Sequence, residues 1–279
     1  MSRLPSRPPG RFGPAELRLA LAAPRPAAGL TSEWRLVAGL RTHTRRSAEP
    51  TSGRTPVVLV HGLAVSHRYL TRLAVALAAS QPVYVPDLPG FGLTARPGSA
   101  YDVGRHAAHL AAWLAEYRLP PVCLVGHSFG AEVAAALAAR HPEAVRALVL
   151  AGPTSDPAAR TRRGQVGRWL LDALREAPWQ VPILLRDVLD ARPWRVYASL
   201  SHSVRNAVEA DLVRVTAPTL VLTGERDTLV PRSWRDEAAR LVPGGRAASV
   251  PGAAHNVLTT APTQAAEAIH GLLSLTPTR

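Results

Sequence analysis

Strand-like and helix-like segments alternate along most of this chain, and no other feature of the sequence restricts its fold as strongly. The stretch TPVVLVHG at residues 55–62 is a continuous β-branched and leucine run that ends in glycine, which is typical of a strand buried on both faces. Further strands are predicted at residues 82–87, 121–126 and 145–153, and helices at about 67–79, 103–117 and 131–140. Because strands separated by such helices pair through βαβ crossovers, we predict an α/β protein with a mostly parallel sheet covered by helices on both faces.

The alternation stops after Pro153 and resumes about sixty residues later. Strands are again predicted at 217–224 and 246–252 and helices at 234–241 and 263–273, and a hairpin is predicted around Gly39, before the first buried strand. We therefore predict a core of residues 31–154 and 215–279, an inserted helical unit of residues 155–214, and a flexible N-terminal arm of residues 1–30.

Composition limits the classes of partner. Apolar residues make up 47% of the 279 residues and the mean hydropathy is +0.01, as in a globular protein. No apolar stretch approaches the ~18 residues that cross a bilayer, so no membrane span is expected. The net charge of +13 would suit nucleic acid or an anionic membrane. Its arginines are scattered, however, and the densest group, Arg160, Arg162 and Arg163, is expected to be a solvated surface, so no nucleic-acid partner is predicted.

The cysteine content and the first thirty residues bear on the cellular compartment in which the protein is expected. Cys123 is the only cysteine, so no intramolecular disulfide is possible, and its apolar surroundings predict a small buried hydrophobe. The N-terminal residues lack a long apolar segment, a small-residue cleavage pattern and paired arginines. We therefore expect a cytoplasmic protein.

Ser128 stands between two glycines where a predicted strand turns directly into a helix, in the sequence Gly126-His127-Ser128-Phe129-Gly130. A turn this tight strains its central residue, and side chains two positions away on either side would collide with the neighbouring strand and helix. Glycine at both positions removes those collisions. The sequence therefore predicts a serine hydroxyl presented at the end of the sheet, with a helix N-terminus beside it.

A nucleophilic serine needs a histidine base, and the base needs a carboxylate that fixes its tautomer. Of the ten histidines, His255 directly follows a predicted strand in a loop before the last helix, so it can reach the same edge of the sheet as Ser128. Asp227 also follows a strand and is the predicted acid. Two other carboxylates are alternatives for this acid. Asp156 follows the sixth strand, and Glu225 lies slightly earlier than Asp227 in the loop that carries Asp227.

The oxyanion formed in acyl transfer needs backbone N–H groups rather than a special side chain. The amide of Phe129 is one predicted donor, because the turn fixes it next to Ser128. The amide of Leu63 is the other, since Gly62 allows the chain to fold in after its strand. On this interpretation His61 is a structural residue that holds the loop.

Six motifs resemble those of the α/β-hydrolase family in their order along the chain, between about Trp34 and Leu273: VHGLAVS, DLPGFGLTARP, VGHSFGAEVA, LVLAGP, APTLVLTGERDTLVP and GAAHNVL. The order serine, aspartate, histidine is also that of the family. The resemblance implies an eight-stranded, mostly parallel sheet with an antiparallel second strand, and a helical cap inserted after the sixth strand. It also implies that Asp87 and the PGFG turn shape the site. Serine at position 128 argues against dehalogenases and epoxide hydrolases of this fold, which use an aspartate nucleophile.

These features predict a serine hydrolase of the carboxylesterase or lipase-like type, which forms an acyl-enzyme on a small, apolar acyl substrate and needs no metal or cofactor. Carbon–carbon bond hydrolysis, peracid formation and acyl transfer use the same triad and remain alternatives, as does a non-catalytic ligand-binding protein of this fold. Trp169, Trp179 and Trp194 in the inserted unit are predicted to roof an apolar pocket. The alternative is that they only pack the inserted helices onto the sheet. The oligomeric state is not predicted.

Overall fold

The computed structural model describes residues 29–48 and 53–276. The predicted arm of residues 1–30 lies outside the described residues except for its last two. The strands are β1 Leu30–Val37, β2 Leu40–Ser47, β3 Val57–Val60, β4 Val83–Pro86, β5 Val122–His127, β6 Val145–Ala151, β7 Thr219–Gly224 and β8 Arg246–Val250.

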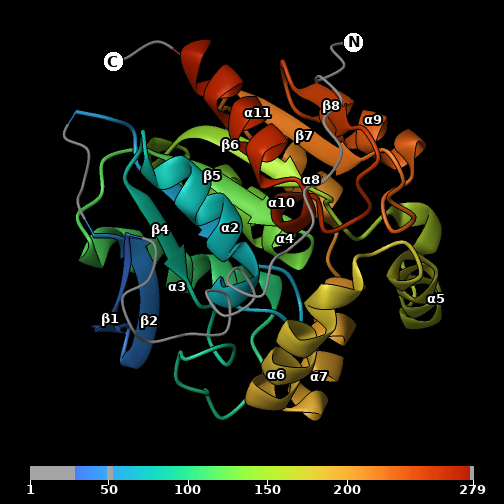
Figure 1. Cartoon of the computed structure of the whole chain (residues 1–279), viewed down its shortest axis with the longest axis horizontal. Coiled ribbons are helices and arrows are strands. Elements are labelled where there is room, and N and C mark those ends of the chain that lie inside the picture. Colours follow the sequence, from blue (N-terminus) through green and yellow to red (C-terminus); the bar gives the residue numbers. More distant parts are fainter. Residues whose placement is uncertain (1–28, 49–52, 277–279) are drawn as a thin grey trace.

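The eight strands form one sheet in the order β1-β2-β4-β3-β5-β6-β7-β8 (Figure 1). Strand β2 pairs antiparallel with both β1 and β4, and every pair from β4 to β8 is parallel. All residues of β3, β5 and β7 are buried, because helices cover both faces of the sheet and leave these strands no solvent side. The predicted eight-stranded, mostly parallel sheet with an antiparallel second strand is thus confirmed.

Two apolar clusters fill the spaces between the sheet and its helices. On one face lie α3 Val103–Glu116, α4 Phe129–Arg140, α8 Val208–Leu212 and α9 Arg232–Leu241. On the other face lie α2 His67–Ala78, α10 Val257–Thr260 and α11 Pro262–Ser274. Short 3₁₀ turns lie at Pro142–Ala144, Pro157–Ala159 and Pro178–Gln180. Helix α4 begins at Phe129, two residues before the predicted start, because Ser128 itself is the N-cap.

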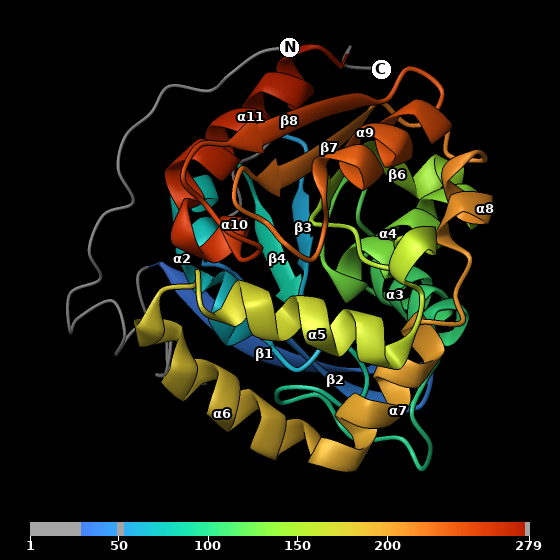
Figure 2. The same cartoon turned by 90° about the vertical axis from the view of Figure 1, so that its right-hand side faces the viewer.

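The stretch between β6 and β7 contains α5 Arg162–Ala173, α6 Val181–Ala191 and α7 Pro193–Ser203, followed by α8. Figures 1 and 2 both place α6 and α7 side by side at the end of the molecule toward which β4 points, and Figure 2 shows α5 running across the same end. These three helices form a cap over the carboxyl ends of the strands. Helix α8 differs, since its fully buried Val208 and Leu212 belong to the cluster beneath α4.

No helix among the described residues is long and apolar enough to cross a membrane.

Candidate active site

The backbone at Ser128 is strained, with φ 55° and ψ −122°, between the last residue of β5 and the first of α4. Its N–H donates to the carbonyl of Ala151 at 2.8 Å, which fixes the turn to the neighbouring strand β6. His127 and Phe129 are buried, whereas Ser128 is partly exposed. The turn therefore presents the serine, and not its neighbours, at the edge of the sheet.

The two glycines of this turn are required by close backbone contacts. A Cβ on Gly126 would lie 2.3 Å from the carbonyl oxygen of Gly130, at the start of α4. A Cβ on Gly130 would lie 2.4 Å from the carbonyl oxygen of His61, in the loop after β3. Both distances are far shorter than any real Cβ contact, so a larger residue at either position would displace the turn.

The structure brings His255 and Asp227 together from the loops after β8 and β7. His255 Nδ1 lies 3.0 Å from Asp227 Oδ2, and the other oxygen of Asp227 accepts the N–H groups of Leu229 and Val230 at 2.9 Å each. Because an ionised carboxylate can only accept, Nδ1 carries the proton. The opposite ring nitrogen, Nε2, is buried and has no hydrogen-bond partner among the described residues. His255 is thus held with its basic nitrogen free.

Neither alternative acid lies in this position. Asp156 accepts a hydrogen bond from Arg168 Nη1 at 2.6 Å, and Glu225 accepts the N–H of Gly252 at 3.1 Å. Both carboxylates are therefore occupied by other partners, and only Asp227 contacts the His255 ring through a hydrogen bond in the described part of the chain.

Contacts with two neighbours place the His255 ring at the edge of the sheet that carries Ser128. A Cβ on Gly152, the residue after Ala151, would lie 2.9 Å from His255 Cε1. The rings of His127 and His255 are 4.9 Å apart, and His127 Nε2 donates to the His255 carbonyl at 3.0 Å. Burial lowers the pKa of His127 to about 3, so this residue is a neutral donor that supports the His255 backbone.

The charge around His255 favours its protonated form. Burial lowers the pKa of the imidazole, but attraction to the Asp227 carboxylate and the hydrogen bond with it act in the opposite direction. Asp172 and Glu176 contribute in the same sense, and the pKa of His255 lies above its ordinary value of 6.5.

Asp172 and Glu176, both contributed by the cap, were missed by sequence reasoning. Asp172 Oδ1 accepts the N–H and the hydroxyl of Thr228, each at 3.2 Å, directly after the Asp227 position. Glu176 Oε1 accepts the N–H of Asn256 at 2.6 Å, directly after His255. The cap is therefore hydrogen-bonded to both loops that carry the histidine and its carboxylate. No local signal in the sequence pairs them, because Asp172 lies in the last turn of α5, which ends at Ala173, and Glu176 lies beyond that end.

The loop after β3 lies against the serine. A Cβ on Gly62 would be 3.1 Å from the Cβ of Ser128. His61 Nδ1 donates to the Gly62 carbonyl at 2.8 Å, and its Nε2 accepts the N–H of Leu88 at 3.0 Å, so His61 holds this loop. The N–H groups of Leu63 and Phe129 have no acceptor among the described residues. Both predicted oxyanion donors are thus free to bind a ligand.

The three tryptophans of the cap are not enclosed. Trp169 and Trp194 are 51% and 50% exposed, and Trp179 is partly buried, with the Arg72 guanidinium 5.9 Å from its ring. Trp169 and Trp194 therefore do not pack into the core, which was the alternative, and the roof over an apolar pocket stays a prediction.

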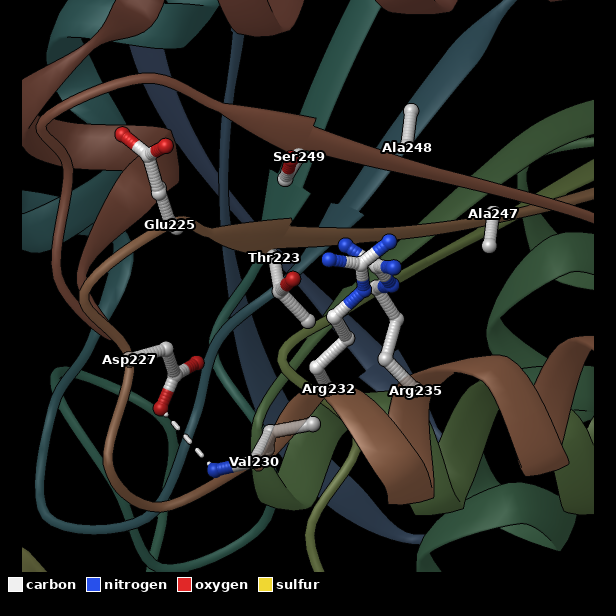
Figure 3. Close-up of a pocket in the computed structure, with 10 residues that line it drawn as sticks. Thr223, Glu225, Asp227, Val230, Arg232, Arg235, Ala247, Ala248 and Ser249 are labelled. Carbon is white, nitrogen blue, oxygen red and sulfur yellow. Dashed lines mark hydrogen bonds between the residues drawn. The ribbon is translucent and has the colours of Figure 1, made fainter. Parts of the chain in front are cut away.

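A cavity of about 210 Å³ lies between the ends of β7 and β8 and helix α9 (Figure 3). Its lining includes Thr223, Ser249 and Asp227, and the guanidinium groups of Arg232 and Arg235 meet in it. Neither Ser128 nor His255 lines it. The cavity therefore lies behind the carboxylate and is separate from the nucleophile.

His43, His67 and Asp87 form the one group among the described residues whose ligand atoms lie within 4.8 Å of one another, as a metal ion would need. Asp87 Oδ2, however, accepts hydrogen bonds from Nδ1 of both histidines at 2.8 Å, and Oδ1 accepts the N–H of His67 at 2.7 Å. Because both Nδ1 atoms carry protons in these bonds, they offer no lone pair to a metal. The group joins the loop after β4 to β2 and α2.

Comparisons with known proteins agree with this fold. Residues 55–177 match the family described as alpha/beta hydrolase fold. The 2-hydroxy-6-oxo-2,4-heptadienoate hydrolase of Pseudomonas putida is 43% identical over 101 residues, which cover 35% of this chain and 37% of that protein. The pimeloyl-[acyl-carrier protein] methyl ester esterase of Xanthomonas campestris is 28% identical over 248 residues, which cover 79% of this chain and 96% of that protein.

A thermophilic esterase from Thermogutta terrifontis has the same fold, with a TM-score of 0.75, 22% identity and coverage of 89% of this chain and 100% of that one. The matches to the Pseudomonas putida hydrolase and to a 2-hydroxymuconate semialdehyde hydrolase of another Pseudomonas span only 37% and 41% of those proteins.

Proposed function

We propose that the chain is an α/β hydrolase that cleaves an ester or related acyl bond with Ser128 as the nucleophile, because residues 55–177 match the model of that family and the fold is that of a known esterase. The Xanthomonas relative that covers most of the chain is by name an esterase, which supports an ester as the substrate class. The substrate is proposed to be a small molecule with an apolar acyl group.

The proposed reaction has two halves. Ser128 Oγ attacks the carbonyl carbon while His255 Nε2 takes its proton, and the amides of Leu63 and Phe129 bind the oxyanion. His255 then returns the proton to the leaving alcohol, which leaves an acyl-serine. Water, deprotonated by His255, attacks this ester, releases the carboxylic acid and restores Ser128. Asp227 keeps Nδ1 protonated and stabilises the imidazolium throughout.

One observation carries this proposal: His255 Nε2 is buried, unpartnered among the described residues, and fixed beside the strained serine turn by the bond from Nδ1 to Asp227. His67 and His127 also have one buried ring nitrogen without a partner among the described residues. His255 differs from them because its Nδ1 is bonded to Asp227 while its ring lies against Gly152, the residue after the one that binds the Ser128 N–H. A free base beside a strained, presented serine is the arrangement that nucleophilic catalysis requires.

Carbon–carbon bond hydrolysis is the second candidate, because the Pseudomonas putida relative acts by name on a ketone that contains no ester. A panel of p-nitrophenyl esters of increasing chain length, with an aryl diketone and a thioester alongside, separates the two. Turnover of the diketone well above that of every ester would replace the ester proposal.

The nucleophile is tested by Ser128→Ala. We expect this variant to lose ester turnover and labelling by a fluorophosphonate probe, because the Oγ that attacks phosphorus is absent. Ser274→Ala, which changes an exposed serine at the end of α11, is the matched control and should keep both. Labelling that persists in Ser128→Ala would show that another residue is the nucleophile.

A further inference from the structure

Helix α5 turns its polar side toward the protein and its apolar side toward solvent, the reverse of an ordinary surface helix. The buried or partly buried stripe carries Gln165, Arg168 and Asp172, each hydrogen-bonded to a neighbouring loop. The outer stripe carries apolar side chains with exposed fractions of 43% for Val166, 51% for Trp169, 55% for Leu170 and 85% for Leu174.

The apolar exposure continues onto the other two cap helices. Ten of the thirteen exposed large apolar residues in the described part of the chain lie between residues 166 and 197. We call these ten the cap face: Val166, Trp169, Leu170, Leu171, Leu174, Val181, Leu185, Leu189, Trp194 and Tyr197. Arg162 Nη1 of α5 donates to the Tyr197 hydroxyl of α7 at 2.7 Å, so these two cap helices meet at this point.

The exposed charges on these helices and their connections are all positive. They are Arg162, Arg163, Arg175, Arg186 and Arg192. Among the described residues 161–203, every carboxylate is at least partly buried and hydrogen-bonded to another group: Asp172, Glu176, Asp187 and Asp190. The cap therefore presents tryptophan, leucine and arginine to its surroundings with no exposed carboxylate between them.

We propose that the cap face binds an anionic lipid surface. Apolar side chains that enter the acyl boundary while arginines meet lipid phosphates are the pattern of helices that lie in a membrane interface, and tryptophan and tyrosine favour that depth. A second copy of the chain would bring arginine against arginine across the contact, so charge complementarity selects an anionic partner.

This surface lies next to the proposed catalytic site. Helix α5 is hydrogen-bonded to Thr228, beside Asp227, on its inner side, and it presents the cap face on its outer side. A chain bound through the cap would hold its reaction loops close to the lipid. Vesicle binding itself requires no turnover, so the proposal stands independently of the reaction.

The test is cosedimentation of the full chain with vesicles. We expect binding to an equimolar mixture of phosphatidylcholine and phosphatidylglycerol, about tenfold or more weaker binding to phosphatidylcholine alone, and loss of binding in high salt. Replacement of two outer residues of α5, Leu170→Glu with Leu174→Glu, should weaken binding to the anionic vesicles about tenfold or more. Trp169 fluorescence should shift to shorter wavelength on binding, because its half-exposed ring leaves water.

The matched control is Leu36→Glu with Val213→Glu, which adds the same charge at apolar positions that are 69% and 51% exposed outside the cap face. This control should bind as the unchanged chain does, and both double variants should keep turnover of a soluble short-chain ester. Ser128→Ala should bind vesicles normally, so failure of the catalytic proposal and failure of this one are distinguishable.

Equal binding to neutral and anionic vesicles, equal loss in the two double variants, or no binding at all would overturn the proposal. Sedimentation equilibrium that finds a dimer dissociated by Leu170→Glu with Leu174→Glu, without vesicle binding, would assign the cap face to a second copy instead.

Discussion

Ser128 and His255 depend on residues that contribute no reactive group themselves. Gly126 and Gly130 leave room for the strained turn, His127 supports the His255 carbonyl, and Glu176 reaches from the cap to the N–H after His255. The negative charges around the imidazole raise its pKa, which moves the acid limit of a histidine-dependent reaction to higher pH.

Glu176→Gln tests this electrostatic influence. Glutamine keeps an acceptor for the Asn256 N–H but removes the negative charge, so the pKa of His255 should fall. The acid limb of kcat/KM, which reports the free enzyme, should then move to lower pH by about half a unit. The limb is measured from pH–rate profiles on a short-chain ester.

Glu143→Gln, at a side chain that is 73% exposed, is the control and should leave the profile unchanged. Burial raises the pKa of Glu176 to about 7, so its charge is fully present only above that pH. An unchanged acid limb in Glu176→Gln would show that the cap does not tune the histidine.

At the scale of elements, buried polar groups fasten the cap to the core, in addition to apolar contacts such as those of Ala191 and Leu184. Asp187 of α6 accepts a hydrogen bond from the Ser66 hydroxyl and pairs with Arg68 of α2, and both charged side chains are 2% exposed or less. Glu132 of α4, which is fully buried, accepts the hydroxyl of Ser203 at the end of α7 at 2.6 Å. Burial of a charge is tolerated only with such partners.

Asp187→Ala should destabilise the protein by about 3 kcal/mol, because it removes one partner of a buried ion pair and leaves the Arg68 charge poorly compensated. Urea unfolding measures this loss. Arg186→Ala, one residue away on α6 and 58% exposed, should change the free energy of unfolding by less than about 0.5 kcal/mol. A similar stability for the two variants would contradict the role of the pair. An Arg68→Met/Asp187→Leu double variant should recover most of the loss.

For the whole molecule, buried histidines link stability to pH. Burial lowers the pKa of His67 and of His109 to about 4 and that of His127 to about 3. In the unfolded chain these groups titrate near 6.5. Above pH 6.5 these histidines are neutral in both the folded and the unfolded chain, so they do not change the free energy of unfolding. As the pH falls from 6.5 toward 4, only the unfolded chain binds protons at them, and the free energy of unfolding decreases.

We therefore expect the free energy of unfolding to fall between pH 7 and pH 5, by about 2 kcal/mol for a fully buried histidine such as His67. The loss should precede the titration of those carboxylates that keep ordinary pKa values near 4. Thermal unfolding followed by circular dichroism across this range measures it, and a Tm that stays constant from pH 7 to pH 5 would contradict the assignment.

Local patterns were sufficient for much of the fold and for the centre of the candidate site. The apolar runs at 57–60, 122–127 and 219–224 predicted strands buried on both faces, and the structure confirms them, because such runs have no polar side to turn to solvent. The glycine-flanked Ser128 predicted its own strained turn, because the requirement for two small residues is local. Loop positions after parallel strands brought His255 and Asp227 to one edge.

The tertiary structure alone decided how the cap is oriented and what it contributes. A helix such as α5 has one polar and one apolar stripe, and the periodicity of the sequence does not say which stripe the core will contact. Thr228 and Arg168 fix that choice through segments about sixty residues apart, so Trp169 is half exposed. For the same reason only folding shows that the exposed charges of the cap are arginines and that its carboxylates are at least partly buried. The sequence by itself thus determined the strands and the serine turn, because these depend on neighbours in the chain, and long-range contacts determined the cap.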